Sequence, residues 1–287
     1  MSRISEHSAL ISWESAVEWL RSQPEHAQLV SECYYDDPLH FACERYWRSE
    51  EWQEVARFIP RRPGVVLDMG AGRGIASYAL ARDGFDVTAL EPNPSGLVGA
   101  GAIRELSRQH NLQIRVVEER SEKSGCATGE FDLVFARAVL HHTDNINTAC
   151  REVFRILKPG GLFIAVREHV ISQPEDLTRF LDNHPLHRLY GGEHAFLLAD
   201  YINAICDAGL TMNKVFSPWA TAINYFPRTL ATLKDEVLDA VFGRNNSIGK
   251  ILRASLDFPG IWPMARRALE LVDRRPGRLY SFIAQKP

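Results

Sequence analysis

From about residue 63 onward, the chain alternates short runs rich in β-branched and aromatic residues with intervals long enough for a helix. The runs are VVLDM, DVTAL, IRVVEE, DLVFAR and LFIAVRE, which begin at residues 65, 86, 114, 132 and 162. Strands separated by helices pair in parallel through crossover connections, so this pattern predicts an α/β fold with a doubly wound, mostly parallel sheet. Two later runs, TMNKVFSP from residue 211 and RLYSFIAQK from residue 278, are predicted to be a sixth and a final strand.

The segments outside this alternation are predicted to be mainly helical. Apolar residues recur at helical spacing before the first strand, as in Trp13, Ala16, Val17 and Leu20. We therefore expect a helical N-terminal cap or lid over residues 1–62, followed by the main domain at 63–287. Within that domain, residues 227–276 are predicted to be a helical insertion before the last strand.

Composition limits the classes of partner and the compartment. With 45% hydrophobic residues the chain can bury a sizeable core, and its formal net charge of -3 gives no electrostatic reason to expect a nucleic-acid or membrane partner. No run approaches the roughly 18 apolar residues of a membrane span, and no signal peptide is recognisable, so we expect a soluble, cytoplasmic protein. The five cysteines are widely spaced and form no CxxC pair, which argues against a disulfide framework or a cysteine zinc site.

The stretch from Asp68 to Gly74 reads DMGAGRG, with glycine at alternate positions after the first strand. Glycine in a strand-turn-helix unit permits unusual backbone angles and lets main-chain N–H groups approach a bound molecule closely. The spacing Gly70-x-Gly72-x-Gly74 differs from the GxGxxG dinucleotide fingerprint. Glu91 ends the second strand about twenty residues on, where a carboxylate can accept hydrogen bonds from both hydroxyls of a ribose, so a nucleoside ligand is indicated.

At these residues the sequence resembles the class I, Rossmann-like, S-adenosylmethionine (SAM) dependent methyltransferases. The motifs VVLDMGAGRG, ALEPN, GEFDLVFARAVLHH and RILKPGGLFIAVRE follow one another in order between residues 65 and 168. The resemblance implies a seven-stranded sheet with an antiparallel last strand, SAM as cofactor and S-adenosylhomocysteine (SAH) as product. A nicotinamide-dependent oxidoreductase would share the glycine turn and the acidic residue but not the last two motifs.

The resemblance also implies roles for the residues of these motifs. Gly70, Gly72 and Gly74 would let the backbone pass the methionine and ribose portions of SAM, with Asp68 near its amino group. Glu91 would hold the ribose. The adenosine would be flanked by Pro92 and Asn93.

The adenine contact departs from the family pattern. Arg120 occupies the place where many members carry an acidic residue. We therefore assign the adenine contact to Ser121 and Glu122 instead. An equal alternative for Glu122 is a solvated surface charge without a ligand contact. Arg137 ends the fourth strand, where open α/β sheets bind ligands, and is assigned to the cofactor site, although a buried ion pair with a carboxylate would explain it too. The pair His141 and His142 is interpreted as packing the short helix that follows.

SAM carries an already activated methyl group, so the protein must mainly align acceptor, methyl carbon and sulfur and exclude water. A hydroxyl acceptor must also lose its proton, which requires a base or a metal ion. Histidines concentrate in residues 168–200, which we interpret as an acceptor-side loop after the fifth strand. We assign His169 or His194 as general base, oriented by Glu168 or Glu193.

Two alternative roles for the histidine-rich loop stay open. His184 and His187 with a carboxylate would make a weak metal-site pattern, and we assign no metal ligands on it. Alternatively the whole loop is a hydrogen-bonded polar network without chemistry. The acceptor pocket is assigned to Tyr34 of the N-terminal lid and to four residues of the loop: His184, His187, Tyr190 and Glu193.

The function expected from the sequence is transfer of a methyl group to an oxygen of a small polar acceptor, such as a saccharide or another metabolite. Methylation of an amine or carboxyl group, on a small molecule or on a protein, is the alternative within the same chemistry. A protein that binds SAM for regulation or assembly without catalysis is the alternative outside it. The sequence does not indicate an oligomeric state.

Overall fold

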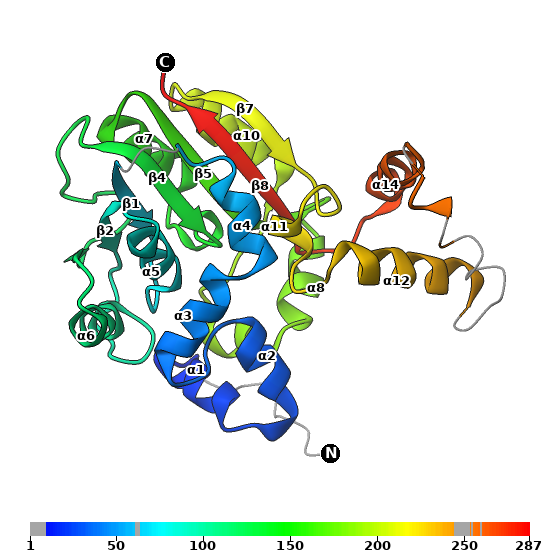
Figure 1. Ribbon diagram of the computed structural model, residues 1–287, viewed down its shortest axis with the longest axis horizontal. Helices are drawn as coiled ribbons and strands as arrows, with labels where there is room; N and C mark the ends of the chain where they lie inside the picture. Colours follow the sequence, from blue (N-terminus) through cyan, green and yellow to red (C-terminus); the bar gives the residue numbers. More distant parts are fainter. Residues whose placement is uncertain (1–9, 61–63, 244–252, 254, 259) are drawn as a thin grey trace.

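The computed structural model describes residues 10–60, 64–243, 253, 255–258 and 260–287. One mixed sheet runs through the molecule in the order β3-β2-β1-β4-β5-β8-β7, with the short β6 paired to β5 (Figure 1). Its strands are β1 Val65–Met69, β2 Asp86–Leu90, β3 Ile114–Val117, β4 Phe131–Arg137, β5 Leu157–Ile171, β6 Phe196–Leu197, β7 Thr211–Phe216 and β8 Arg278–Gln285. All seven runs predicted from the sequence are strands.

The direction of the strands follows the prediction. β1 pairs in parallel with β2 and β4, and β4 pairs in parallel with β5. The last strand β8 is antiparallel and lies between β5 and β7. The predicted α/β fold, a seven-stranded, mostly parallel sheet with an antiparallel last strand, is therefore confirmed, with β6 as a short addition.

Successive residues of the strands enter two apolar layers, one on each face of the sheet. Leu67 and Phe163 pack on one face with residues of α7 and α10, while Val66 and Ile164 pack on the other with α3, α4 and α5. The helices of these layers are α3 Leu39–Trp47, α4 Glu50–Ala56, α5 Ile75–Arg82, α7 Ile146–Ile156 and α10 Leu198–Asp207. A further helix, α6 Ala100–His110, follows β2. The alternation arises because side chains of a strand point to opposite faces.

The N-terminal part of the chain is helical, as predicted, and its first helices lie below the sheet in Figure 1. It consists of α1 Trp13–Arg21, the 3₁₀ turn η1 Pro24–His26 and α2 Ala27–Glu32, followed by α3 and α4. Ala16 and Leu20 of α1 pack with Leu186 of the loop after β5, far along the chain. The N-terminal helices and the loop after β5 thus share a small apolar core of their own.

Residues 168–200 are more regular than the loop predicted from the sequence. β5 continues to Ile171, and α8 Asp176–Asp182 and α9 Pro185–Tyr190 follow it. The segment LKPGG lies within β5, where Leu157 pairs with Phe131 and regular pairing resumes at Leu162.

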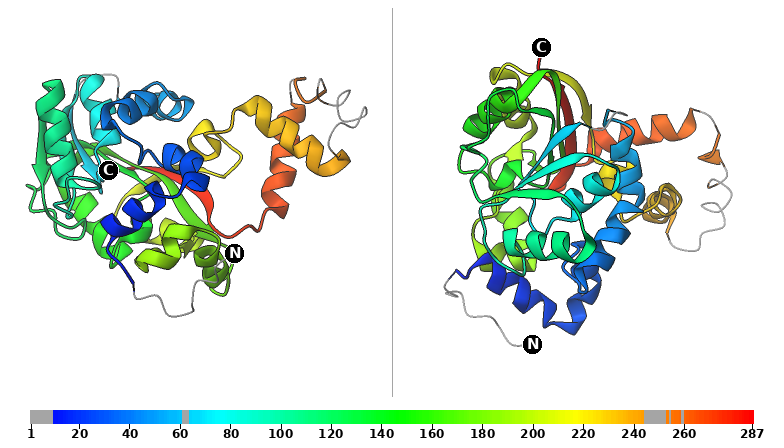
Figure 2. Two further views of the ribbon diagram at one scale, coloured as in Figure 1. Left: turned by 90° about the horizontal axis from the view of Figure 1, so that it is seen from below. Right: turned by 60° about the vertical axis from the view of Figure 1, so that its left-hand side comes forward.

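The predicted insertion before the last strand is helical where it is described. α11 Ala222–Tyr225 precedes it, and α12 Leu230–Phe242 and α14 Ile261–Val272 stand away from the sheet (Figures 1 and 2). None of the helices in the described ranges is both long and apolar enough to cross a membrane.

Candidate functional site

A cavity of about 600 Å³ opens at the carboxyl ends of β1, β2, β4 and β5. Its wall brings together the glycine turn, the N-terminal helices and the loop after β5. Parallel sheets bind ligands at this edge, where the loops leave the strands. Most of the site residues predicted from the sequence line it: Tyr34, Asp68, Gly70, Gly72, Glu91, Pro92, Asn93, Ser121, Glu122, Arg137, His169, His184, His187, Tyr190 and Glu193.

The glycine turn has the backbone conformation that the sequence indicated. Gly70, Gly72 and Gly74 have φ angles of +63°, +53° and +87°, in the left-handed region that side chains disfavour. A Cβ at Gly70 would also lie 2.7 Å from a methyl group of Val139, so this glycine is needed for packing as well. The turn therefore presents bare backbone to the cavity at Gly70 and Gly72.

Glu91 organises this turn from the end of β2. Its Oε2 accepts a hydrogen bond from the Gly72 N–H at 2.8 Å, and its Oε1 accepts one from the Asn93 N–H at 2.9 Å. Burial raises the pKa of Glu91, and these two N–H donors oppose the rise. The carboxylate is thus held in place at the cavity wall, where it can also accept hydrogen bonds from a ligand.

Asp68 lies deeper, at the end of β1. Its Oδ2 accepts a hydrogen bond from the Ser77 hydroxyl at 2.5 Å, and only 1% of the residue is exposed. Burial raises the pKa of Asp68 to about 7, although the Ser77 hydrogen bond counters part of the shift. A cationic group of a ligand would restore the ionised carboxylate.

Arg73, the charged side chain of the turn, connects the N-terminal helices to the glycine-turn side of the cavity. Its Nη1 donates to the carbonyl oxygens of Tyr34 and Asp36, both at 3.1 Å, and its Nη2 forms an ion pair with Asp37 at 2.5 Å. These contacts hold Tyr34 over the cavity. The Tyr34 hydroxyl is buried without a hydrogen-bond partner, and burial raises its pKa to about 12.

Arg137 forms the buried ion pair that the sequence analysis held as the alternative to cofactor binding. Its Nε and Nη2 donate to the two carboxylate oxygens of Glu51 at 2.6 and 3.1 Å. Arg167 approaches the same carboxylate at 3.6 Å and donates to the carbonyl oxygens of Ile223 and Phe226. Burial alone would lower the pKa of Arg137, but Glu51 reverses the effect and raises it. Both arginines line the cavity, and one fully buried carboxylate serves both.

The region expected to meet the adenine is more open. Glu122 accepts a hydrogen bond from the Asn145 N–H at 3.3 Å, and Arg120 pairs with Asp144. Arg120, Ser121, Glu122 and Asp144 all line the cavity. The structure therefore places Ser121 and Glu122 at the rim without assigning either a ligand contact.

An irregularity in β5 directs three consecutive polar residues toward the site. The pairing of β5 with β8 shifts register between Ala165 and Glu168, and Arg167 has a φ of +61°. Such bulges redirect side chains and are common beside active sites. As a result, Glu168 is fully buried, while Arg167 and His169 both line the cavity.

Glu168 orients His141 rather than His169, which differs from the pairing suggested by the sequence. It accepts hydrogen bonds from the N–H groups of Val139, Leu140 and His141 at 3.0 to 3.2 Å, and it contacts Nδ1 of His141 at 2.6 Å. His141 lies in the 3₁₀ turn η2 Leu140–His142. Burial opposes protonation of His141, but Glu168 and Glu193 outweigh it and raise its pKa to about 9.

Glu193 stands on the opposite side of His141. Its oxygens lie 3.3 Å from Nε2 of His141, 3.6 Å from Nε2 of His142 and 3.7 Å from Nε2 of His187. Burial alone would raise the pKa of Glu193, and these histidines reverse the effect and lower it. Glu193 thus lies close to three imidazoles, and a ligand in the cavity would be near both a carboxylate and imidazole rings.

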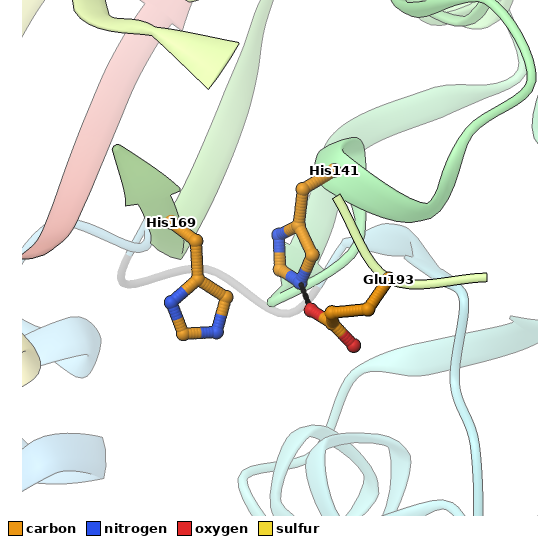
Figure 3. Close-up of side chains that lie close together, drawn as sticks. All are labelled: His141, His169 and Glu193. Atoms are coloured by element: carbon orange, nitrogen blue, oxygen red, sulfur yellow. Dashed lines mark ion pairs between the residues drawn. The ribbon is translucent and has the colours of Figure 1, made fainter. Parts of the chain in front are cut away.

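His169 projects into the same cluster from β5. Its Nδ1 lies 3.1 Å from the carbonyl oxygen of Gly277, so Nδ1 carries the proton and Nε2 is left as a lone-pair nitrogen. Its ring centre is 4.7 Å from that of His141 (Figure 3). Burial, followed by His141, lowers the pKa of His169 well below its usual value.

The other loop residues divide between the cavity wall and the loop's own packing. His184 stacks on His187 with ring centres 4.3 Å apart, and Tyr190 packs edge-on against Trp13 at 5.0 Å. His194 is not part of the cavity wall: its ring lies against Phe196, and its Nδ1 is buried without a hydrogen-bond partner. The structure therefore separates the two histidines that the sequence suggested as bases, since only His169 lines the cavity.

Glu51 and His141 are important to the site but were not assigned to it from the sequence. Glu51 lies in α4, 86 residues before Arg137, and nothing in its local sequence indicates a partner so distant. His141 was interpreted as a packing residue. Its position directly after the fourth strand, near a sheet edge where ligands bind, was the available signal.

Comparisons with known proteins agree with the fold and the motifs. A family model described as a methyltransferase domain matches residues 67–165. The ubiquinone/menaquinone biosynthesis C-methyltransferase of Nitrobacter hamburgensis is 29% identical over 55% of this chain and 65% of its own length. The malonyl-[acyl-carrier protein] O-methyltransferase of Enterobacter lignolyticus is 32% identical over 46% of this chain and 50% of its own length. The chain thus matches between half and two thirds of these two relatives.

Among solved structures, the Haemonchus contortus phospholethanolamine N-methyltransferase 2 in complex with phosphomonomethylethanolamine and S-adenosylhomocysteine matches 97% of this chain and 61% of its own. The TM-score is 0.57 at 16% identity, which supports the shared fold. Residues 67–165 therefore match a methyltransferase domain, and the resemblance to the class I SAM-dependent methyltransferases is confirmed as a resemblance.

Proposed function

We propose, on the premise of this methyltransferase domain, that the protein transfers a methyl group from SAM to a hydroxyl of a small polar acceptor, such as a saccharide. One observation carries the proposal. The glycine turn with Glu91, here called the donor half, and the cluster of His141, His169 and Glu193, here called the acceptor half, line one cavity of about 600 Å³. A methyl donor on the first part would meet the acceptor at the second.

The donor half has the groups that SAM requires. Bare backbone at Gly70 and Gly72 leaves room for the methionine and ribose portions, Glu91 offers carboxylate oxygens to the ribose hydroxyls, and Asp68 offers a carboxylate to the amino group. A ligand ammonium would lower the pKa of Asp68 from about 7 and keep it ionised. SAM supplies the activated methyl group, and the protein aligns it and excludes water.

The acceptor half offers a base. The Gly277 carbonyl fixes the Nδ1 proton of His169, so Nε2 can take the proton of an acceptor hydroxyl as the oxygen attacks the methyl carbon. Arg137, Arg167 and the unpartnered Tyr34 hydroxyl add polar groups on another part of the wall. This mixture favours a hydroxylated, polar acceptor over an apolar one. Relatives named as O-methyltransferases and C-methyltransferases both match the chain, so the methylated atom rests on the histidine argument.

The first experiment is calorimetric titration of the protein with SAH, in parallel with NAD. We expect 1:1 binding of SAH and none of NAD. Glu91→Ala removes two ribose hydrogen bonds to a charged group, each contributing about 1.5–3 kcal/mol, so the affinity for SAH should fall by about 100-fold or more. Glu118→Ala, at an exposed residue one position past β3, is the control and should leave the affinity unchanged.

Acceptors are then screened with labelled SAM, beginning with hydroxylated sugars. Transfer to a sugar hydroxyl supports the proposal, and transfer to an amine or a carboxyl group would replace it with the alternative within the same chemistry. Binding of NAD alone would overturn the donor assignment. SAH binding with no transfer to any acceptor class, together with Glu91→Ala but not His169→Ala abolishing function in cells, would favour a non-catalytic SAM-binding protein.

A further inference from the structure

The two histidines and the carboxylate in Figure 3 converge on one point at the cavity wall. His141, His169 and Glu193 each offer one ligand atom, and these atoms lie within 4.8 Å of one another. Nε2 of His141 is 3.3 Å from Oε1 of Glu193. Ligand atoms of a tetrahedral zinc ion are separated by about 3.4 Å, since zinc–nitrogen and zinc–oxygen bonds are about 2.0–2.2 Å long. One pair is therefore already at the spacing of metal ligands, and the ligand atom of His169 lies within 4.8 Å of both and would have to move closer on binding.

The far nitrogens of both imidazoles are held by acceptors with fixed positions. Nδ1 of His141 contacts Glu168, which three backbone N–H groups hold in turn, and Nδ1 of His169 faces the Gly277 carbonyl. Metal-binding histidines almost always have such an acceptor on the second nitrogen, because it sets the tautomer and the direction of the ring. A hydrogen-bonded polar network without a metal would not require a fixed acceptor on Nδ1 of both His141 and His169.

The charges of the cluster point to a cation. Glu168 is fully buried and Glu193 is 7% exposed. In the described part of the chain, the ion-pair partners of both carboxylates are histidines, which carry charge only when protonated. A divalent cation would balance both carboxylates with all imidazoles neutral.

We propose that His141, His169 and Glu193 bind a divalent transition-metal ion such as Zn²⁺ at the wall of the cavity. Glu168 and the Gly277 carbonyl act as positioning groups for the two histidines. Two histidines and one glutamate with a position left open are one of the ligand sets found in catalytic zinc sites, and imidazole nitrogen suits transition metals better than Mg²⁺ or Ca²⁺. The pair His184 and His187 that the sequence suggested for a metal is not the set that converges.

The catalytic consequence rests on the proposed function, although metal binding itself does not. An acceptor hydroxyl in the open position would be acidified by the ion and lose its proton more readily as it attacks the methyl group. His169 would then act as a ligand of the ion and the hydroxyl would lose its proton to solvent or to a neighbouring base. The methyl donor, the acceptor and the transferred methyl group are the same whether His169 acts as a base or as a metal ligand.

The test uses the tag-free, full-length protein after treatment with a chelator. Calorimetry with Zn²⁺ and visible absorption with Co²⁺ should each show one saturable site per chain. His169→Ala and Glu193→Gln should weaken Zn²⁺ binding by at least about 100-fold, and Glu168→Gln by about 10- to 100-fold through His141. The Co²⁺ spectrum of Glu168→Gln should also change, which loss of a purely structural contact would not produce. His110→Ala, at an exposed histidine of α6, is the matched control and should bind Zn²⁺ like the original protein.

SAH binding distinguishes this inference from the proposed function. Each variant should keep its affinity for SAH, which shows that it is folded, because the donor residues are not metal ligands. Absence of a saturable Zn²⁺ or Co²⁺ site would overturn the metal site and leave the methyltransferase proposal intact. The same conclusion would follow if His169→Ala and Glu193→Gln bound Zn²⁺ as tightly as the original protein. Zn²⁺ binding in a protein that does not bind SAH would support the site and overturn the proposed function.

Discussion

The two halves of the cavity are built in different ways. The donor half consists mainly of residues close together in sequence, from Asp68 to Asn93, with Ser121 and Glu122 at its rim, and part of its surface is the bare backbone of Gly70 and Gly72. The acceptor half combines side chains from the N-terminal helices, β4, β5 and the loop after β5, and depends on ion pairs such as Arg137 with Glu51. The binding surface of the donor half therefore depends mainly on one strand-turn-helix region. Substitutions in the acceptor half could alter which substrate binds without altering the sheet.

The largest difference expected between the halves is catalytic. His169→Ala should lower kcat by about 10²- to 10⁴-fold, the usual contribution of proton transfer, with SAH affinity unchanged within about twofold. His194→Ala should change kcat by less than about threefold, since its ring is not part of the cavity wall. Rates are measured with an acceptor found in the screen. Equal losses in both variants would contradict the assignment of His169.

The second prediction tests whether the acceptor half depends on its long-range ion pairs. Glu51→Gln leaves two largely buried guanidinium groups, each with a side chain 16% exposed, without a counter-charge and should lower the free energy of unfolding by about 3 kcal/mol, the low end for a buried ion pair. Glu50→Gln, at the exposed neighbouring residue of α4, should change it by less than about 0.5 kcal/mol. Urea denaturation measures both. A loss below about 1 kcal/mol for Glu51→Gln would mean that water or another group compensates these arginines.

A third prediction concerns backbone in the donor half. Gly70→Ala adds a Cβ 2.7 Å from Val139 at a φ of +63°, whereas Gly129→Ala meets no atom within 4 Å at a φ of +66°. Both changes incur about 1–2 kcal/mol of left-handed strain, and only Gly70→Ala adds about 1–3 kcal/mol for overpacking. Thermal unfolding and SAH titration should show the extra loss for Gly70→Ala alone. Equal behaviour would show that Val139 moves aside freely.

The smallest effect expected is a pH dependence of donor binding. Burial raises the pKa of Asp68 to about 7 in the ligand-free protein, above its value in the unfolded chain. Its contribution to stability is therefore lost as the pH rises through about 7, whereas binding of a ligand ammonium needs the ionised form. SAH affinity should rise about tenfold between pH 6 and 8, and Asp68→Asn should bind more weakly with no such rise. A flat profile in the original protein would place the amino group elsewhere.

The described elements show which parts of the fold were predictable. All seven strands follow from short runs rich in β-branched and aromatic residues, because such a pattern depends on neighbouring residues. The helices α8 and α9 were missed because a polar stretch such as EHVISQPEDLTRF has no strong apolar period. They are stabilised by packing with α1 and the end of β5.

The sequence by itself determined the sheet, the glycine turn and the position of Glu91, since each depends on residues within one strand-turn-helix unit. Only the tertiary structure decided that Arg137 pairs with Glu51, that Glu168 orients His141, and that His169 lines the cavity while His194 does not. These contacts join residues 27 to 86 positions apart or depend on a bulge in β5. Side-chain contacts of that kind follow from packing of the whole chain, which no local pattern encodes.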